Sequence, residues 1–327
     1  MSQYLTMKSK LDVKNSATLR FAPSTTGYAH PGTLLSALLC WLDARSRGDR
    51  FIIRLENLDP ERCRPEFEQA MLDDLAWLGL DWDEVGYQRD QVKHHEAALD
   101  DLASRGLLYT CCCSRADIKT RCRPAADGGF AYDGACREQL LAPGAWRTTE
   151  HAVRVRLPDD EIEVVDESGE VYRQTPAHDM GDPVVRRRDG AIAYHLACVV
   201  DDARAGIKRL IRGRDLLPSA PVQILLHRML GLPVPAYRHH FLLLEPQGDK
   251  LAKLHGSIDT RTLRQHYTPE QLCGQLAAWA GLIESEQPCE PADLTPAFMW
   301  THIRRENLDV RVASGRLMSA SPSSSSN

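Results

Sequence analysis

The sequence predicts an α/β fold built on a parallel sheet, and three observations at its N-terminal end carry this prediction. Leu19 to Ala22 form a short apolar segment typical of a buried strand. A loop of small residues and then a helical pattern over 31–47 follow. Phe51 to Leu55 form a second apolar strand pattern. Strand, helix and strand in this order make a βαβ unit, whose strands lie parallel with a right-handed crossover.

The helix predicted over 31–47 has clear ends and an apolar face. Pro31 suits the first helical turn, and Gly48 ends the helix. Its apolar residues recur at helical spacing. They are Leu34, Leu35, Leu38, Leu39 and Leu42.

The rest of the chain predicts further elements. An amphipathic helix over 64–79 places Phe67, Met71, Leu75 and Leu78 on one face. Residues 109–145 carry little periodicity and indicate an insertion. The remaining expectations are a helix over 90–105, short strands within 151–175, a buried strand over 190–200, a helix over 218–230, a strand over 241–244 and a helix over 268–282.

Composition excludes several classes of protein. Among 327 residues, 43% are hydrophobic and 26% charged, which is globular usage and excludes a largely disordered chain. The net charge of −5 argues against a polycation that coats nucleic acid. The longest apolar run, Leu34 to Leu42, is too short for a membrane span, and residues 1–10 lack the apolar core of a signal peptide. We therefore expect a cytoplasmic protein without a membrane partner.

The loop over 23–30 leads from a strand into a helix N-terminus, which is a place where anions bind. It contains neither G-x-G-x-x-G nor the G-x-x-x-x-G-K-S/T phosphate loop. It offers Ser24, Thr26, Gly27 and His30 instead. A histidine there can donate a hydrogen bond to a phosphoryl oxygen as charge develops. On spacing alone, His30 also fits a simple helix cap.

Two lysines far along the chain, Lys250 and Lys253, follow a predicted strand and are three residues apart. Each is a compact charge on a long stem, suited to reaching the same phosphates from a loop. On spacing alone, the pair also fits a solvated surface turn.

These segments together carry a family resemblance. Arg20-Phe21-Ala22-Pro23-Ser24-x-Thr26-Gly27-x-x-His30-x-Gly32 resembles the "HIGH" motif of class I glutamyl-tRNA synthetases, and Lys250-Leu251-Ala252-Lys253-Leu254 resembles their "KMSKS" loop. The segments 54–60, 199–202 and 211–216 are similar to further family motifs. The resemblance spans about residues 19–260. It implies a class I synthetase Rossmann-type sheet with a zinc-bearing insertion and a short helical C-terminal region.

Only 73 residues follow Leu254, so no anticodon-reading domain is expected there. The chain therefore resembles the glutamyl-queuosine tRNA(Asp) synthetases, a truncated subfamily. The resemblance implies that ATP, with Mg²⁺, activates L-glutamate to glutamyl-adenylate, and that the glutamate passes to queuosine in the anticodon loop of tRNA(Asp). Two alternatives are a short glutamyl-tRNA synthetase that charges the tRNA 3′ end and a non-catalytic zinc-ribbon RNA-binding protein. We expect a monomer.

The resemblance also implies roles for individual residues. His30 and Lys253 would be catalytic, and arginines would grip the two carboxylates of glutamate. The glutamate site would comprise Arg20, Phe21, Ala22, Pro23, Ser24, Glu56, Tyr194 and Arg212. The ATP site would comprise Gly27, His30, Gly32, Lys250 and Lys253. Three positions depart from the family motifs, namely Pro31, Thr33 and Ala252.

Five of the ten cysteines lie in the insertion. In a reducing compartment such clusters favour metal binding over disulfides. Cys111 and Cys113 point the same way in an extended segment. The family pattern C-x-C…Y-x-x-x-C matches Cys111, Cys113, Tyr132 and Cys136, which implies a structural zinc site. Cys112 and Cys122 are rivals for the fourth ligand, and free thiols without metal are the alternative.

The resemblance divides the chain into six parts. They are a loose leader (1–17), the first half of the Rossmann catalytic domain (18–108), the zinc-bearing insertion with short strands (109–175), the second half with the "KMSKS"-like loop (176–260), a helical C-terminal region (261–318) and a disordered tail (319–327). Residues 181–214 carry eight Lys or Arg against four Asp. Arg186 to Arg188, Lys208 and Arg209 fit either contacts to RNA phosphates or a solvated charged face.

Overall fold

The computed structural model describes residues 17–245 and 258–319. The predicted βαβ unit is present as β1 (Thr18–Phe21), α1 (Pro31–Arg47) and β2 (Arg50–Leu55), followed by α2 (Pro65–Trp77) and β3 (Glu84–Tyr87). β1, β2 and β3 are adjacent and parallel. Helix α1 begins at Pro31 and ends at Gly48, whose φ of 69° is left-handed, so both predicted end signals are confirmed.

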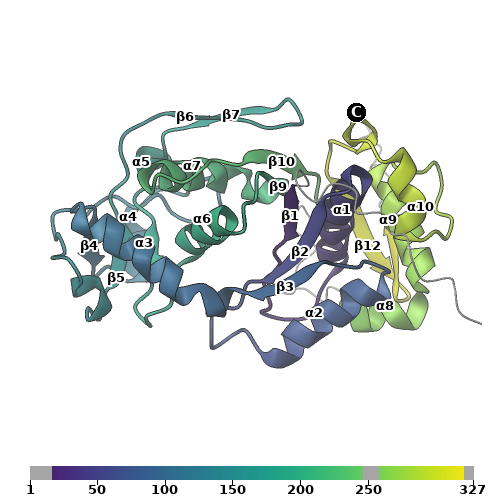
Figure 1. The fold of residues 1–327 in the computed structure, drawn as a ribbon, viewed down its shortest axis with the longest axis horizontal. Helices are drawn as coiled ribbons and strands as arrows, with labels where there is room; N and C mark the ends of the chain where they lie inside the picture. Colours follow the sequence, from purple (N-terminus) through teal and green to yellow (C-terminus); the bar gives the residue numbers. More distant parts are fainter. Residues whose placement is uncertain (1–16, 246–257, 320–327) are drawn as a thin grey trace, which may run out of the picture.

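The second half of the chain extends this sheet. β9 (Arg209–Gly213) and β10 (Ala236–His240) pair in parallel, and a parallel bridge joins Thr18 to Ile207 just before β9. β9 therefore lies beside β1, which gives the order β3-β2-β1-β9-β10. Helix α1 packs against β1, β2 and β9 (Figure 1). The predicted parallel sheet of a class I fold is thus present, assembled from two segments far apart in the chain.

The insertion folds beside the parallel sheet, at the left of Figure 1. β4 (Leu108–Cys111), β5 (Ala152–Val155) and β8 (Val184–Arg186) form an antiparallel sheet. β6 (Ile162–Val165) and β7 (Val171–Gln174) form a hairpin, as predicted for short strands in this region. η1 (Gln88–Gln91) and α3 (Val92–Ser104) precede the insertion, and α4 (Arg115–Arg121), η2 (Ala145–Arg147) and α5 (Pro176–Asp179) are its short helical elements and the one that follows.

The buried strand predicted over 190–200 is wrong. Residues Tyr194–Arg204 form helix α6. Its residues 196–202 are all buried, so the helix is covered on most of its circumference. A continuous apolar run of this length gives no periodicity that separates a buried helix from a buried strand.

The C-terminal part packs against the other side of α1, at the right of Figure 1. Before it come η3 (Arg214–Ser219) and α7 (Ala220–Met229), and α7 packs on α6 instead. The C-terminal elements are β11 (Leu243–Leu244), α8 (Thr260–His266), α9 (Pro269–Ala280), α10 (Pro291–Leu294), η4 (Thr295–Ala297), η5 (Trp300–His302), β12 (Leu308–Ala313) and β13 (Arg316–Ser319). The helices predicted over 218–230 and 268–282 are confirmed. The expected strand over 241–244 is present only as the short β11, after the longer β10. The region 261–318, expected to be helical, ends in the β12–β13 hairpin.

No helix within residues 17–245 and 258–319 combines the length and apolar character needed to cross a membrane. The "KMSKS"-like residues Lys250 and Lys253 lie outside the described residues, as does the predicted tail beyond Ser319.

Candidate active site

A cavity of about 580 Å³ opens where β1, β2 and β9 end, beside the start of α1. This is the carboxyl edge of the parallel sheet, where α/β proteins bind their ligands. Eight of the predicted site residues line it: Phe21, Ala22, Pro23, Ser24, His30, Gly32, Glu56 and Tyr194. Gly27, Arg20 and Arg212 are not part of its lining.

The loop after β1 is tied to the end of β2. The Glu56 N–H donates to the Pro23 carbonyl at 2.9 Å, and the Thr25 N–H donates to the Glu56 carbonyl at 3.3 Å. Ser24 therefore lies opposite Glu56 as a bridge partner. The two strand ends converge, which places the Glu56 side chain and the loop on the same cavity.

The start of α1 offers fewer N–H groups than its sequence suggests. Pro31 has none. The N–H groups of Thr33 and Leu34 both donate to the carbonyl of His30, at 2.9 and 3.2 Å. His30 is the residue at the helix N-cap, with extended backbone. Within the described residues, these bonds leave mainly the Gly32 N–H of the first turn for an anion.

Glu56 belongs to a buried network of charges. Its Oε1 accepts from Arg54 Nη2 at 3.4 Å and from Cys198 Sγ at 3.2 Å. Burial raises the pKa of Glu56, while the positive charge of Arg54 opposes that rise. The network therefore presents a desolvated carboxylate to the cavity.

Arg20 and Arg54 share the carboxylate of Asp202. Arg20 Nε lies 3.2 Å from Asp202 Oδ1, and Arg54 Nη1 lies 2.5 Å from the same oxygen. All three residues are buried. Burial alone would raise the pKa of Asp202, but the two guanidinium groups lower it to about 2. Asp202 lies in the 199–202 motif, but sequence reasoning assigned it no role; in the fold it is the counter-ion that allows two arginines to be buried behind the cavity.

Arg212 lies at the end of β9 and is also buried. Its Nη1 donates to Gln223 Oε1 at 2.7 Å, and its Nη2 donates to the Leu216 carbonyl at 3.2 Å. Its Nε donates to His239 Nε2 at 3.0 Å. A guanidinium carries five N–H groups, so two remain beyond these three contacts.

His239 connects Arg212 to the β6–β7 hairpin. Because its Nε2 accepts from Arg212, the proton of its ring lies on Nδ1, which donates to Asp166 Oδ2 at 2.7 Å. Asp166 also accepts from the His239 backbone N–H at 2.9 Å. Burial lowers the pKa of His239, which favours the neutral ring that this arrangement needs. Sequence reasoning missed both residues, since they are 73 positions apart.

Tyr194 begins α6 and leaves 37% of its surface exposed. The cavity lining also includes residues that sequence reasoning did not assign, among them Arg62 and His240. Arg62 donates to Asp59 Oδ2 at 2.8 Å, within the 54–60 motif. His240 Nδ1 contacts the Phe241 carbonyl at 2.7 Å, and its Nε2 lies 3.1 Å from Ser36 Oγ. His240 is the last residue of β10, and its position directly before the apolar segment 241–244 was the available signal.

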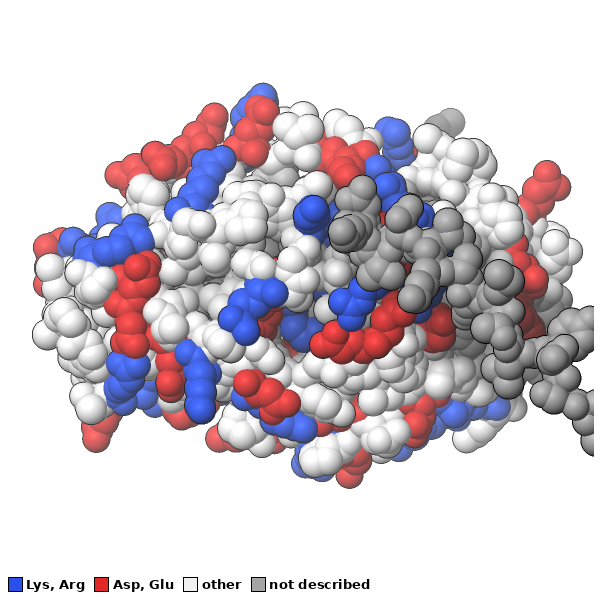
Figure 2. All heavy atoms as spheres, viewed as in Figure 1, with Lys and Arg blue, Asp and Glu red and all other residues white. Residues whose placement is uncertain are grey.

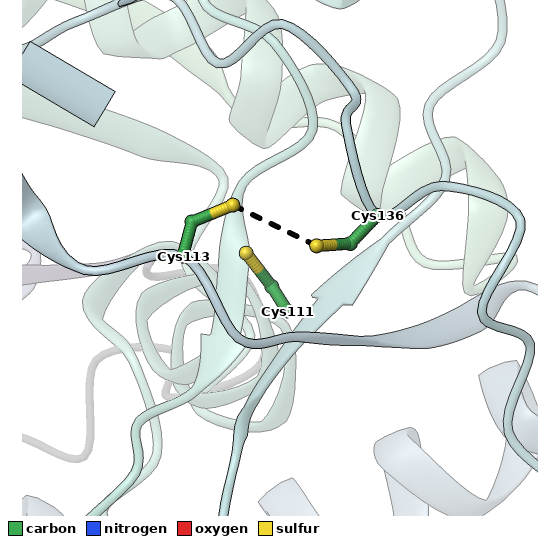
Figure 3. A group of neighbouring side chains, drawn as sticks. All are labelled: Cys111, Cys113 and Cys136. Atoms are coloured by element: carbon green, nitrogen blue, oxygen red, sulfur yellow. Dashed lines mark hydrogen bonds between the residues drawn. The ribbon is translucent and has the colours of Figure 1, made fainter. Parts of the chain in front are cut away.

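A second cluster lies in the insertion, where three thiols meet (Figure 3). The sulfurs of Cys111, Cys113 and Cys136 all lie within 4.8 Å of one another, with 3.6 Å between Cys113 and Cys136. The Tyr132 hydroxyl lies 3.4 Å from Cys111 Sγ and 3.9 Å from Cys113 Sγ. The four residues predicted from the family pattern are therefore brought together, and the three thiols could hold a metal ion.

The two rivals for the fourth ligand fit less well. Cys112 Sγ lies 3.8 Å from Cys136 Sγ, yet Cys112 is outside the group whose sulfurs are mutually close. Cys122 is also outside it. Burial alone would raise the pKa of Cys111, but hydrogen bonds from Tyr132 and Arg154 lower it, which favours the thiolate that metals bind.

Gly181 allows Tyr132 to reach the thiols. Its φ is 72°, and a Cβ at this position would lie 2.3 Å from the Tyr132 carbonyl oxygen. The Tyr132 N–H donates to the carbonyl of the preceding Met180 at 3.1 Å. A side chain at Gly181 would therefore displace the segment that carries Tyr132.

The arginines considered for RNA contact make bonds within the fold. Arg187 pairs with Asp59 and Asp189, and Arg188 donates to backbone carbonyls of the cysteine cluster. Arg209 is nearly buried between Asp43 and Glu167. Figure 2 shows basic and acidic side chains interspersed over the face viewed. The charge count over 181–214 therefore reflects internal ion pairs to a large extent.

Comparison with known proteins agrees with this geometry. Residues 16–286 match the family model of the catalytic domain of class I (E and Q) tRNA synthetases. A glutamyl-Q tRNA(Asp) synthetase of Symbiobacterium thermophilum is 43% identical over 305 residues, 88% of this chain and 94% of that protein. One from Neisseria meningitidis is 41% identical over 278 residues, 84% of this chain and 92% of that protein.

A solved glutamate tRNA ligase of Elizabethkingia meningosepticum, crystallised with its amino acid, has the same fold, with a TM-score of 0.72 and 24% identity. The match covers 89% of this chain and 66% of the ligase, so this chain spans about two thirds of that protein's length. The resemblance seen in the sequence motifs is confirmed: the chain belongs to the glutamyl-Q tRNA(Asp) synthetase family of class I tRNA synthetases.

Proposed function

We propose that this enzyme activates L-glutamate with ATP to glutamyl-adenylate and transfers the glutamate to queuosine in tRNA(Asp). The observation that carries the amino-acid part is a carboxylate, Glu56, facing a cavity whose walls are backed by buried arginines. The relatives named above share the tRNA(Asp) specificity in their names and match nearly their whole length. We propose that the protein acts as a monomer.

In this proposal the ammonium group of glutamate binds Glu56 and its carboxylates bind arginine. The two N–H groups that Arg212 has left suit one carboxylate, and Arg20, which keeps N–H groups beyond its two bonds to Asp202, would bind the other. Phe21, Ala22, Pro23, Ser24 and Tyr194 shape the cavity around the chain of the substrate. Glutamine would leave a buried guanidinium without its anion, at a cost of about 3–5 kcal/mol.

For the ATP step, an oxygen of the substrate α-carboxylate attacks the α-phosphorus and pyrophosphate leaves. Positioning and charge stabilisation suffice for such a step. His30, with Gly27 and Gly32, would hold the triphosphate, and Lys250 and Lys253 would neutralise the leaving group. Mg²⁺ bound with ATP would supply further positive charge to the phosphates.

Amino-acid-dependent exchange of labelled pyrophosphate into ATP tests the activation step. We expect exchange with glutamate and, at equal concentration, at least about 100-fold less with glutamine. Exchange that is equal for both amino acids, or absent for both, would contradict the proposed activation.

We further propose that Cys111, Cys113, Tyr132 and Cys136 bind a structural Zn²⁺. Thiolates on a tetrahedral zinc lie about 3.8 Å apart, since each Zn–S bond is about 2.3 Å. The 3.6 Å between Cys113 and Cys136 fits this geometry. The site would hold β4 to the 132–136 segment, and these residues would leave no open position for catalysis.

Purified protein is expected to contain about one zinc per chain, and Cys136→Ser to lose it. Amide hydrogen exchange over residues 108–140 should then become faster, because the metal no longer joins the two segments. Glutamate-dependent pyrophosphate exchange should persist, since the cysteines do not line the cavity. Metal analysis and hydrogen exchange test this, with exposed Cys112→Ser as the matched control. Full zinc content in Cys136→Ser would exclude this ligand set.

His239→Leu is expected to raise the KM for glutamate about tenfold, because Arg212 loses the acceptor that fixes its Nε. The KM for ATP should stay unchanged. His239→Gln keeps an acceptor on a side chain of similar reach, so its KM should lie closer to that of the wild type. Equal defects in both variants, or no change in either, would show that His239 does not orient Arg212.

A further inference from the structure

One face of α6 places three residues against the charged network. Tyr194, Cys198 and Asp202 follow at intervals of four, which aligns them along one side of a helix. Tyr194 lines the cavity at one end, and Asp202 binds Arg20 and Arg54 at the other. Cys198 lies between them and contacts Glu56.

The Cys198 thiol is a buried hydrogen-bond donor. Only 3% of the residue is exposed, and its Sγ lies 3.2 Å from Glu56 Oε1. Burial holds the pKa of Cys198 well above its ordinary value, so the sulfur keeps its proton. A thiol in this state donates to a carboxylate and does not act as a nucleophile.

Arg54 contacts the same oxygen, Oε1, at 3.4 Å. A carboxylate at the end of a flexible Glu side chain rotates freely unless contacts restrain it. Two donors converging on Oε1 from different elements, β2 and α6, fix the plane of the carboxylate. Within the described residues these contacts leave Oε2 as the oxygen for a ligand in the cavity.

We propose that Cys198 is a positioning residue, which orients Glu56 to receive the ammonium group of the amino-acid substrate. This inference rests on the proposed function, in which that substrate is glutamate. Cys198 then has a specific role in the site, beyond filling space in the core.

Cys198→Ala and Cys198→Ser separate this role from packing. Alanine removes the donor, whereas serine restores an O–H near the same place. We expect Cys198→Ala to raise the KM for glutamate about three- to tenfold in pyrophosphate exchange, with kcat and the KM for ATP within about twofold. Cys198→Ser should return the KM to within about twofold of the wild type. Cys273→Ala, at a fully buried cysteine on α9 outside the cavity lining, is the matched control.

A second readout uses glutarate, which has both carboxylates of glutamate but no amino group. Its inhibition constant should be the same for wild type and Cys198→Ala, because it makes no ammonium contact. An unchanged glutamate KM in Cys198→Ala, a serine variant as defective as the alanine variant, or a parallel loss of glutarate inhibition would overturn the proposal. Absence of glutamate-dependent exchange in the wild type would instead refute the proposed function.

Discussion

Asp202→Asn is expected to lower the free energy of unfolding by about 3–5 kcal/mol, which is the cost of removing one partner from a buried ion pair. Asp202 is the carboxylate that Arg20 and Arg54 share, at 3.2 and 2.5 Å. Without its charge, two buried guanidinium groups lie close together. Among the described residues, Arg54 then keeps the longer ion-pair contacts to Glu56 and Asp201, at 3.4 and 4.0 Å. Urea unfolding of the two proteins measures the difference.

The free energy of unfolding that Asp202 contributes should depend on pH. The pKa of Asp202 is lowered from an ordinary 3.8 to about 2 in the folded protein. Ionised Asp202 therefore stabilises the fold fully above about pH 4, and this stabilisation is lost as the pH falls through about 2. The difference between wild type and variant should be constant from pH 5 to 8. Glu163→Gln, which removes an exposed ion pair with Arg173 on the β6–β7 hairpin, should change stability by less than about 1 kcal/mol. Equal losses of unfolding free energy in Asp202→Asn and Glu163→Gln would contradict the role of Asp202 as the buried counter-ion.

Glu56→Gln is expected to lower kcat/KM for glutamate-dependent pyrophosphate exchange about 100-fold. Glutamine has the same shape and keeps an oxygen for Cys198 and Arg54, so the fold should persist. The charge that meets the substrate ammonium is lost. Arg54 and Arg20 also lose part of the negative charge that balances their own. Steady-state exchange kinetics at varied glutamate measure the effect.

Glu84→Gln is the control for this prediction, because Glu84 lies at the exposed start of β3, paired with Arg50. Its exchange kinetics should match the wild type. A Glu56→Gln enzyme within about threefold of the wild type would show that Glu56 does not bind the ammonium group.

Much of the catalytic half of the molecule could be predicted from local sequence. Pro31 and Gly48 mark the ends of α1, and the apolar segments 19–22 and 51–55 match β1 and β2. Ser24, His30 and Glu56, which the resemblance assigns to the substrate sites, line one cavity. Each of these signals lies within a few residues of the feature it predicts.

Other features depend on contacts between distant segments. Residues 194–200 of the run that was predicted as a strand belong to α6, and the prediction is wrong because a segment buried on most sides shows no helical periodicity. The same helix brings Cys198 and Asp202 to Glu56 and Arg20, across 142 and 182 positions of sequence. Arg212 likewise contacts His239, which lies 27 positions further along the chain. The motifs contain residues that line the cavity, whereas long-range partners such as Cys198 and His239 are evident only from the fold.

The most direct test of the central claim uses labelled glutamate, ATP and Mg²⁺ with two preparations of tRNA(Asp), one containing queuosine and one lacking it. Each is assayed intact and after removal of the 3′-terminal adenosine. We expect acid-precipitable label on the queuosine-containing tRNA alone, unaffected by loss of the 3′ adenosine. Equal label on both preparations that disappears with the 3′ adenosine would show 3′-end charging and contradict the proposal. Label on neither, with pyrophosphate exchange also absent, would indicate a binding protein without this activity.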